Sequence, residues 1–372
     1  MRIQSIHLLT FLLSALPVFS EEITTFGQVL GKASDAIGPV ADVLGIVSFI
    51  IENLPDPEKI HGTKVTIGVN QNNVSSDGFG GTIRTIWGYD SLNHVLGSAD
   101  LDQKVPAGEA TQIEIHQQLG QGVPAQYISI LAGDDETCIS YVVATFPGES
   151  DSHSWMGDVG SICGQSWYMG YSPHGTFNGT AYYPRCTWMD TNHGDKLARP
   201  VPITNRQMKI NMLAYDATNP EASKGTDYLC NASIFTWEND DPIAEAPSRG
   251  PNPLTQQQHA RRAEGIGTSL ARVPRPRTPE TARHLIVNSR VQQSAVDLCH
   301  SPTSRGQDFA STNEGLFCDM ETKTLHQLCS DSVKVDCYDL DTEQMALTRV
   351  SDPKRGIQSR DVKNYNRLSH WD

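Results

Sequence analysis

The chain has 372 residues, and its 29 lysine and arginine residues against 43 aspartate and glutamate residues give a formal net charge of −14. A chain of this length is expected to form two domains or more. The acidic balance argues against a nucleic-acid partner and against attraction to strongly anionic lipid. A membrane partner would therefore be recognised through something other than net charge.

Residues 1–20 have the pattern of a secretory signal peptide. Arg2 precedes an apolar centre from Leu8 to Phe19, and the small residue Ser20 ends a cleavage motif. No later apolar run reaches the ~20 uninterrupted residues that a membrane-spanning helix needs. We therefore expect a secreted, extracellular protein whose mature chain begins at Glu21.

Sequons and cysteines agree with export. The three sequons lie at Asn73, Asn178 and Asn231, and each needs a surface position to be glycosylated. The eight cysteines fall into two groups of four, namely Cys138, Cys163, Cys186 and Cys230, and then Cys299, Cys318, Cys329 and Cys337. In an oxidising compartment each group can close two disulfides. Each group allows three pairings, and the sequence does not choose among them.

Residues 21–57 are predicted to form an amphipathic helix that ends at the proline pair Pro55 and Pro57. Its apolar residues recur mostly at three- and four-residue steps and form one stripe. The stripe includes Phe26, Val29, Leu30, Ile37, Val40, Leu44, Val47, Ile50 and Ile51. A helix of about 28 residues is ~42 Å long, which exceeds the ~30 Å hydrocarbon core of a bilayer. The same pattern also fits a helix that packs on the core of the protein.

From residue 58 to residue 238 the apolar pattern changes from a helical period to alternation. Strands are expected at 64–70, 82–89, 111–117, 126–133 and 138–146, with further candidates at 180–190, 208–217 and 227–238. The segments between them are rich in turn residues. Short strands without helices between them predict a mainly β domain, built as an antiparallel sandwich or barrel.

The amino-acid composition changes twice in the last third of the chain. Residues 239–284 are proline-rich and polar, and they are expected to be a disordered linker. Within the linker, Arg261 and Arg262 form a dibasic pair of the kind that kexin-type proteases cut, although an arginine-rich solvated linker looks the same. Residues 285–372 combine four cysteines with few apolar residues, which predicts a small disulfide-held module.

Three motifs follow one another in a recognisable order: "KVTIGVNQNN", "QKVPAGEATQIEI" and "YISILAGDDETCISYVVATFPGES". In this order, Lys64–Val69, Lys104–Gly108 and Thr145–Pro147 resemble the first strand, a loop and a turn of actinoporins, the sea-anemone pore-forming cytolysins. The resemblance covers residues 26–214. It implies an antiparallel β-sandwich with an N-terminal amphipathic helix that leaves the sandwich to build an oligomeric pore.

The resemblance also implies a head-group site for phosphocholine lipid. Thr145 and Pro147 match the turn, Tyr182 and Tyr183 match the paired tyrosines that cover the choline, and Trp155 falls near the exposed tryptophans of the family. Aromatic faces hold a quaternary ammonium by cation–π attraction of ~0.5 to 2 kcal/mol each. Trp155 is the only tryptophan or tyrosine in "GESDSHSWMGD", where the family has several, which weakens the docking surface.

No enzymatic motif of a protease, hydrolase, P-loop or dinucleotide-binding protein is present, so neither an enzyme nor a cofactor is expected. Three histidines, His153, His174 and His193, form a candidate metal site with Asp158 or Asp190. Scattered histidines of this kind are more often surface residues, and no metal is predicted.

The leading hypothesis is a secreted, membrane-binding, pore-forming cytolysin or toxin-like virulence protein. Its partners would be lipid of a target-cell membrane and further copies of itself. The alternative is a non-lytic secreted effector or glycan-binding sandwich, in which the N-terminal helix is core. A third hypothesis is a two-chain toxin, produced by cleavage at Arg262, whose C-terminal module supplies a second activity.

Overall fold

The computed structural model describes residues 62–71, 78–117, 122–149, 152–177, 179–191, 205–215, 225–231, 233–238, 283–346 and 363–372. The predicted helix within 21–57, the sequons at Asn73 and Asn178, and the pair Arg261–Arg262 lie outside these residues. Within the described ranges no helix is long and apolar enough to cross a membrane.

The first sheet is built around β7 (Thr137–Thr145), whose nine residues are all buried and are rich in β-branched side chains. The strand order is β4-β1-β7-β12-β9, and β8 pairs with the part of β7 that β12 leaves free. All of these pairs are antiparallel. The remaining strands are β1 (Lys64–Val69), β4 (Ala110–Glu114), β8 (Ser152–Met156), β9 (Trp167–Tyr168) and β12 (Cys186–Met189).

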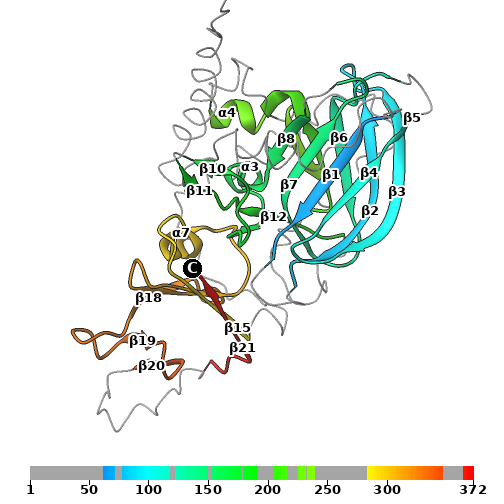
Figure 1. The fold of residues 1–372 in the computed structure, drawn as a ribbon. Coiled ribbons are helices and arrows are strands. Elements are labelled where there is room, and N and C mark those ends of the chain that lie inside the picture. Colours follow the sequence, from blue (N-terminus) through cyan, green and yellow to red (C-terminus); the bar gives the residue numbers. More distant parts are fainter. Residues whose placement is uncertain are drawn as a thin grey trace, which may run out of the picture.

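The second sheet is also antiparallel, with the order β14-β13-β6-β2-β3-β5. Its strands are β2 (Gly81–Tyr89), β3 (Val95–Val105), β5 (His116–Gln117), β6 (Tyr127–Ala132), β13 (Gln207–Asn211) and β14 (Phe235–Glu238). The two sheets face each other across one hydrophobic cluster that contains Val65, Ile86, Ile130 and Val142 (Figure 1). The prediction of a mainly β, antiparallel fold is confirmed.

Short elements connect strands within each of the two sheets. They are α3 (Gly157–Ile162), β10 (Thr176–Phe177), β11 (Thr180–Ala181), the 3-10 turn η2 (Met212–Tyr215) and α4 (Thr226–Leu229). The five leading strand predictions each coincide with observed strands, whereas the candidate at 227–238 begins as α4 before β14. Strand β3 was not predicted, because its second half is mostly polar and exposed.

The C-terminal module, residues 283–346 and 363–372, forms a mixed sheet with the order β20-β19-β18-β17-β16-β15-β21. Strand β15 (His284–Asn288), next to the edge strand, is parallel to both of its neighbours, β16 (Asp308–Ser311) and β21 (Arg367–Trp371). Helix α7 (Ala295–His300) begins after Ser294, whose hydroxyl accepts a hydrogen bond from the Asp297 amide. The other strands are β17 (Leu316–Asp319), β18 (Thr324–Leu328), β19 (Cys337–Asp339) and β20 (Gln344–Ala346).

All eight cysteines pair within their own group of four. The bonds are Cys138–Cys186, Cys163–Cys230, Cys299–Cys318 and Cys329–Cys337. The expectation that each half closes two disulfides is therefore confirmed. Four disulfides are typical of an extracellular or secreted protein.

The disulfides should differ in their effect on stability, because cross-linking a longer loop removes more entropy from the unfolded chain. Cys163 and Cys230 are separated by 67 residues and Cys329 and Cys337 by 8. Loop-closure entropy predicts losses of about 4 kcal/mol for the Cys163→Ala/Cys230→Ala variant and about 2.5 kcal/mol for Cys329→Ala/Cys337→Ala. Urea unfolding would measure both losses, and a larger loss for the shorter loop would contradict the prediction.

Candidate functional site

Trp155, expected near an exposed aromatic cluster, is fully buried, with 0% of its surface exposed. On β8 it pairs with Val142 of β7, which faces the sandwich core. Its indole stacks on Phe235 with 5.5 Å between ring centroids. The expectation of an exposed Trp155 is therefore corrected, because alternation along β8 turns this residue inward.

Tyr182 and Tyr183, the two tyrosines predicted to cover choline, contact different partners. The Tyr182 hydroxyl donates a hydrogen bond to the buried carboxylate of Asp158. The ring of Tyr183 instead lies under the guanidinium of Arg290, 3.9 Å from its centroid, and Arg290 belongs to the C-terminal module. Tyr183 therefore already holds a cation, and that cation is supplied by the protein itself.

Thr145 and Pro147, the turn residues of the predicted head-group site, lie at and just after the C-terminal end of β7. Thr145 is buried, and its hydroxyl is hydrogen-bonded to the Ser152 hydroxyl at 2.8 Å. Pro147 follows in the turn and is half-buried. Of the five residues predicted to bind lipid, Trp155 lies in the core, Tyr182 contacts Asp158 and Tyr183 contacts Arg290. The other two, Thr145 and Pro147, lie at this turn. The five residues therefore do not form one exposed aromatic surface.

Arg185 connects the sandwich to the module. Its backbone amide donates to Asp158, and its guanidinium forms an ion pair of 2.8 Å with Asp297 on α7. The guanidinium also lies 4.2 Å from the centroid of the Trp167 ring. Burial raises the pKa of both carboxyl groups, and the charge of Arg185 opposes this rise. The contacts of Arg185 with Asp158, Asp297 and Trp167 therefore have a structural role, which is to join the sandwich to the module.

The histidines proposed as metal ligands are separated. His153 stacks on Phe146 and contacts Glu149 at 3.4 Å, whereas His174 packs edge-on against Tyr141. His193 lies outside the described residues. Over the part of the chain that the structure describes, no group of three or more His, Cys, Asp or Glu side chains is arranged to hold a metal ion.

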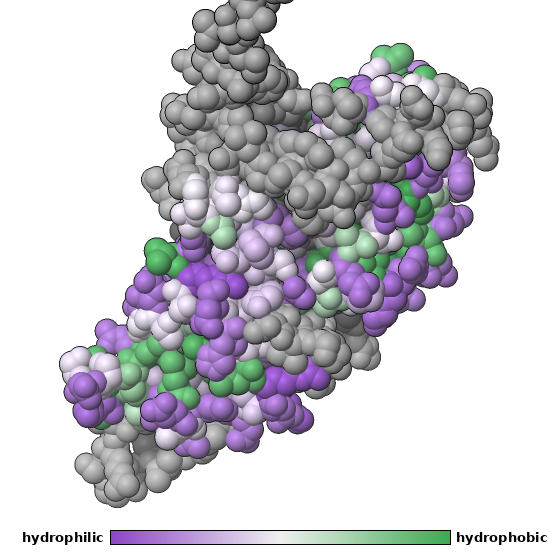
Figure 2. Space-filling model, in the orientation of Figure 1, coloured by the Kyte–Doolittle hydropathy of each residue, from purple (hydrophilic) through white to green (hydrophobic). Residues whose placement is uncertain are grey.

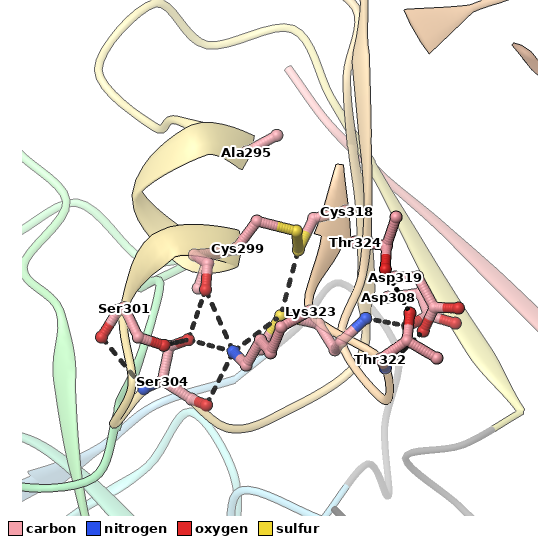
Figure 3. Close-up of a disulfide and its surroundings, with 12 residues drawn as sticks. Ala295, Cys299, Ser301, Ser304, Asp308, Cys318, Asp319, Thr322, Lys323 and Thr324 are labelled. Atoms are coloured by element: carbon pink, nitrogen blue, oxygen red, sulfur yellow. Dashed lines mark hydrogen bonds between the residues drawn. A yellow bond between two sulfur atoms is a disulfide. The ribbon is translucent and has the colours of Figure 1, made fainter. Parts of the chain in front are cut away.

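A serine–lysine pair beside a disulfide has the composition of a catalytic dyad. Figure 3 shows the Lys323 amine at the end of α7, where it donates to the carbonyl oxygens of Leu298 and Ser304 and to the Ser304 hydroxyl. Ser304 is fully buried, and its hydroxyl donates to the Leu298 carbonyl at 2.6 Å. The hydroxyl proton is directed away from the lysine, so the pair caps the helix and has no access to a substrate.

Exposed apolar side chains occur at the end of the sandwich remote from the module, which we call the distal tip: residues 90–94 between β2 and β3, and residues 122–126 before β6. Leu92 is 74% exposed and Val123 is 39% exposed. The two loops are adjacent because Tyr89 pairs with Tyr127 between β2 and β6. Figure 2 shows a small apolar group at this upper-right end of the sandwich and a larger apolar area over the module at the lower left.

The sequon within the described residues lies at the surface. Asn231 is exposed, and its side-chain oxygen accepts hydrogen bonds from the Ser233 amide at 3.0 Å and the Ser233 hydroxyl at 2.8 Å. The hydroxyl of the sequon therefore touches its asparagine, and glycosylation there stays a prediction.

Four aromatic side chains that pack with the module were not predicted from the sequence. They are Phe79, Trp167, Tyr168 and Trp188, which share a hydrophobic cluster with residues of the module. The available signal was the density of aromatic residues between Trp167 and Tyr171, close in sequence to the strand at 186–189.

Comparisons with known proteins leave the family open. No family model matches the chain, and none of the curated proteins matches it. Among solved structures, a deletion variant of LOX, a lipoxygenase, is similar at 18% identity and a TM-score of 0.20, and the same variant with arachidonate at 15% and 0.19. Each match covers 25% of this chain and 14% of the LOX chain. A likeness at this level carries no argument about fold or activity.

His174 should make stability depend on pH. Burial lowers its pKa to about 4, below the ~6.5 of an unfolded histidine. The unfolded state therefore binds more protons as the pH falls from about 6.5 to about 4, and the free energy of unfolding decreases over this window. His174→Gln should reduce that pH dependence in urea titrations, with the exposed His116→Gln as the matched control. An unchanged pH slope in His174→Gln would contradict the assignment.

Proposed function

We propose that this protein is secreted and binds the membrane of a target cell through the distal tip of its sandwich. The observation that carries the proposal is the pair of exposed apolar side chains, Leu92 and Val123, on adjacent loops at the end remote from the module. Fully burying a side chain of this kind is favourable by ~1.5 to 3 kcal/mol. Two such residues provide a weak apolar anchor that further copies or further contacts would strengthen.

The charge near the tip favours a zwitterionic lipid surface. Asp90 accepts hydrogen bonds from the Leu92 and His94 amides and pairs with the His94 ring at 3.0 Å. These hydrogen bonds lower the pKa of Asp90 against the effect of its burial. With a formal net charge of −14 on the whole chain, phosphocholine head groups are better partners than anionic ones.

Charges placed at the tip should weaken membrane binding without unfolding the protein. We expect Leu92→Asp/Val123→Asp to lower the affinity for phosphatidylcholine vesicles at least about tenfold, since the burial of both side chains is lost. Vesicle co-sedimentation would measure the affinity, and thermal unfolding would verify the fold.

The matched control is Val335→Asp, at a 56% exposed position in the module. It should bind vesicles as the unchanged protein does. If Val335→Asp loses vesicle binding and Leu92→Asp/Val123→Asp keeps it, the protein docks through the module, and the proposal for the tip is wrong.

Permeabilisation would require a second element, for which we propose the stretch Phe26 to Leu54. Its sequence carries four charges, and an ionised side chain at mid-bilayer costs ~2.5 to 3.5 kcal/mol on insertion scales. Val29→Asp or Val47→Asp should therefore leave secretion and vesicle binding intact while abolishing dye release. Unchanged dye release in both variants would rule out insertion of this stretch.

A non-lytic secreted binding protein is the second candidate. It is favoured by the burial of Trp155, by the Arg290 guanidinium over Tyr183, and by the exposed large apolar side chains of the described residues, none of which is aromatic. If this candidate is correct, the folded protein will bind no vesicle of any head-group class. The Asp substitutions at Val29 and Val47 would then lower the yield of folded protein.

A further inference from the structure

The sandwich and the C-terminal module share one hydrophobic core at the proximal end of the sandwich, the end opposite the distal tip. Trp167, Tyr168 and Trp188 of the sandwich lie in the same cluster as Leu298, Phe309 and Trp371 of the module. All of these side chains are buried. Separating the two parts would expose them to water, which the hydrophobic effect opposes.

The polar atoms of Trp167, Tyr168 and Trp188, the three rings that the sandwich contributes, are hydrogen-bonded across the same interface. The Trp167 indole donates to the Ser301 hydroxyl at 2.9 Å, and the Trp188 indole donates to the Arg305 carbonyl at 2.9 Å. The Tyr168 hydroxyl donates to the Gln307 carbonyl at 3.0 Å. Loss of the module would leave three ring donors without these acceptors, and unsatisfied buried donors are unfavourable.

The backbones of the two parts also pair directly. The Arg305 amide donates to the Trp167 carbonyl at 2.9 Å, and the Trp167 amide donates to the Thr303 carbonyl at 3.3 Å. This bridge covers edge strand β9. Gly306 follows with a φ of +154°, and a Cβ at this position would lie 2.4 Å from the ring of Tyr168. Only glycine allows the module backbone to approach the ring so closely.

Two ion pairs also join the sandwich and the module. Arg185 of the sandwich pairs with Asp297 of the module at 2.8 Å, and Arg305 of the module pairs with Glu136 of the sandwich at 2.9 Å. The two pairs run in opposite directions, so each part contributes one cation and one anion. This reciprocity fixes the orientation of the module on the sandwich.

No disulfide joins the two parts, because all four bonds lie within one part or the other. Their only covalent connection is the chain between residues 238 and 283. We infer that the module is a noncovalent partner of the sandwich that stays bound when the chain is cut between these residues. Cleavage at Arg261–Arg262 would then produce a two-chain protein and not a released module.

Limited proteolysis of the purified full chain tests this inference. The protein is cut with a kexin-type protease or with trypsin, and mass spectrometry locates the cut. We expect gel filtration to give one native peak that contains both fragments in equal amounts. A non-reducing denaturing gel should separate the same sample into two bands, because no disulfide links them. Fragments that elute separately under native conditions would overturn the inference.

Two glycine variants test the interface itself. Gly306→Ala places a methyl group against Tyr168, whereas Gly315→Ala adds a methyl group at another positive-φ position with nothing within 4 Å. In the cut protein we expect Gly306→Ala to raise the dissociation constant of the fragments at least about tenfold, and Gly315→Ala to leave the fragments associated. Equal dissociation constants in the two variants would show that the contact at Tyr168 does not hold the parts together.

Discussion

The structure depends on the burial of aromatic side chains at the proximal end of the sandwich. Strand β9 is an edge strand that carries Trp167 and Tyr168 next to Trp188 of β12. An exposed edge with such side chains is a template for aggregation. The module removes this edge from water by packing its own apolar residues on the rings and by pairing residues Thr303 to Arg305 with Trp167. The module therefore completes the sandwich.

Under the function proposed here, the two ends of the sandwich have different roles. At the proximal end, Arg290 of the module occupies the face of Tyr183, and Arg185 is held between Trp167 and Asp297. The aromatic and cationic groups that suit recognition of a ligand thus contact one another within the protein. For this reason we propose docking through the distal tip, where the apolar side chains of Leu92 and Val123 are exposed.

Local patterns predicted much of the fold, and long-range contacts explain what they missed. Alternation identified β1, β2, β6 and β7, because one face of each strand meets the core. The cysteine groups correctly indicated separate disulfides in each half. Resemblance by position placed Trp155 at a surface, but pairing with β7 turns it inward. The contacts of Trp167 and Trp188 with residues more than 100 positions away leave no periodic signal in the sequence.

Hydrogen–deuterium exchange of the intact protein, with and without phosphatidylcholine vesicles, tests docking through the distal tip most directly. The account predicts slower exchange on vesicles for residues 90–94 and 122–126, and no change in strands β18 to β20 of the module. Protection of those module strands, with none at the distal tip, would contradict it.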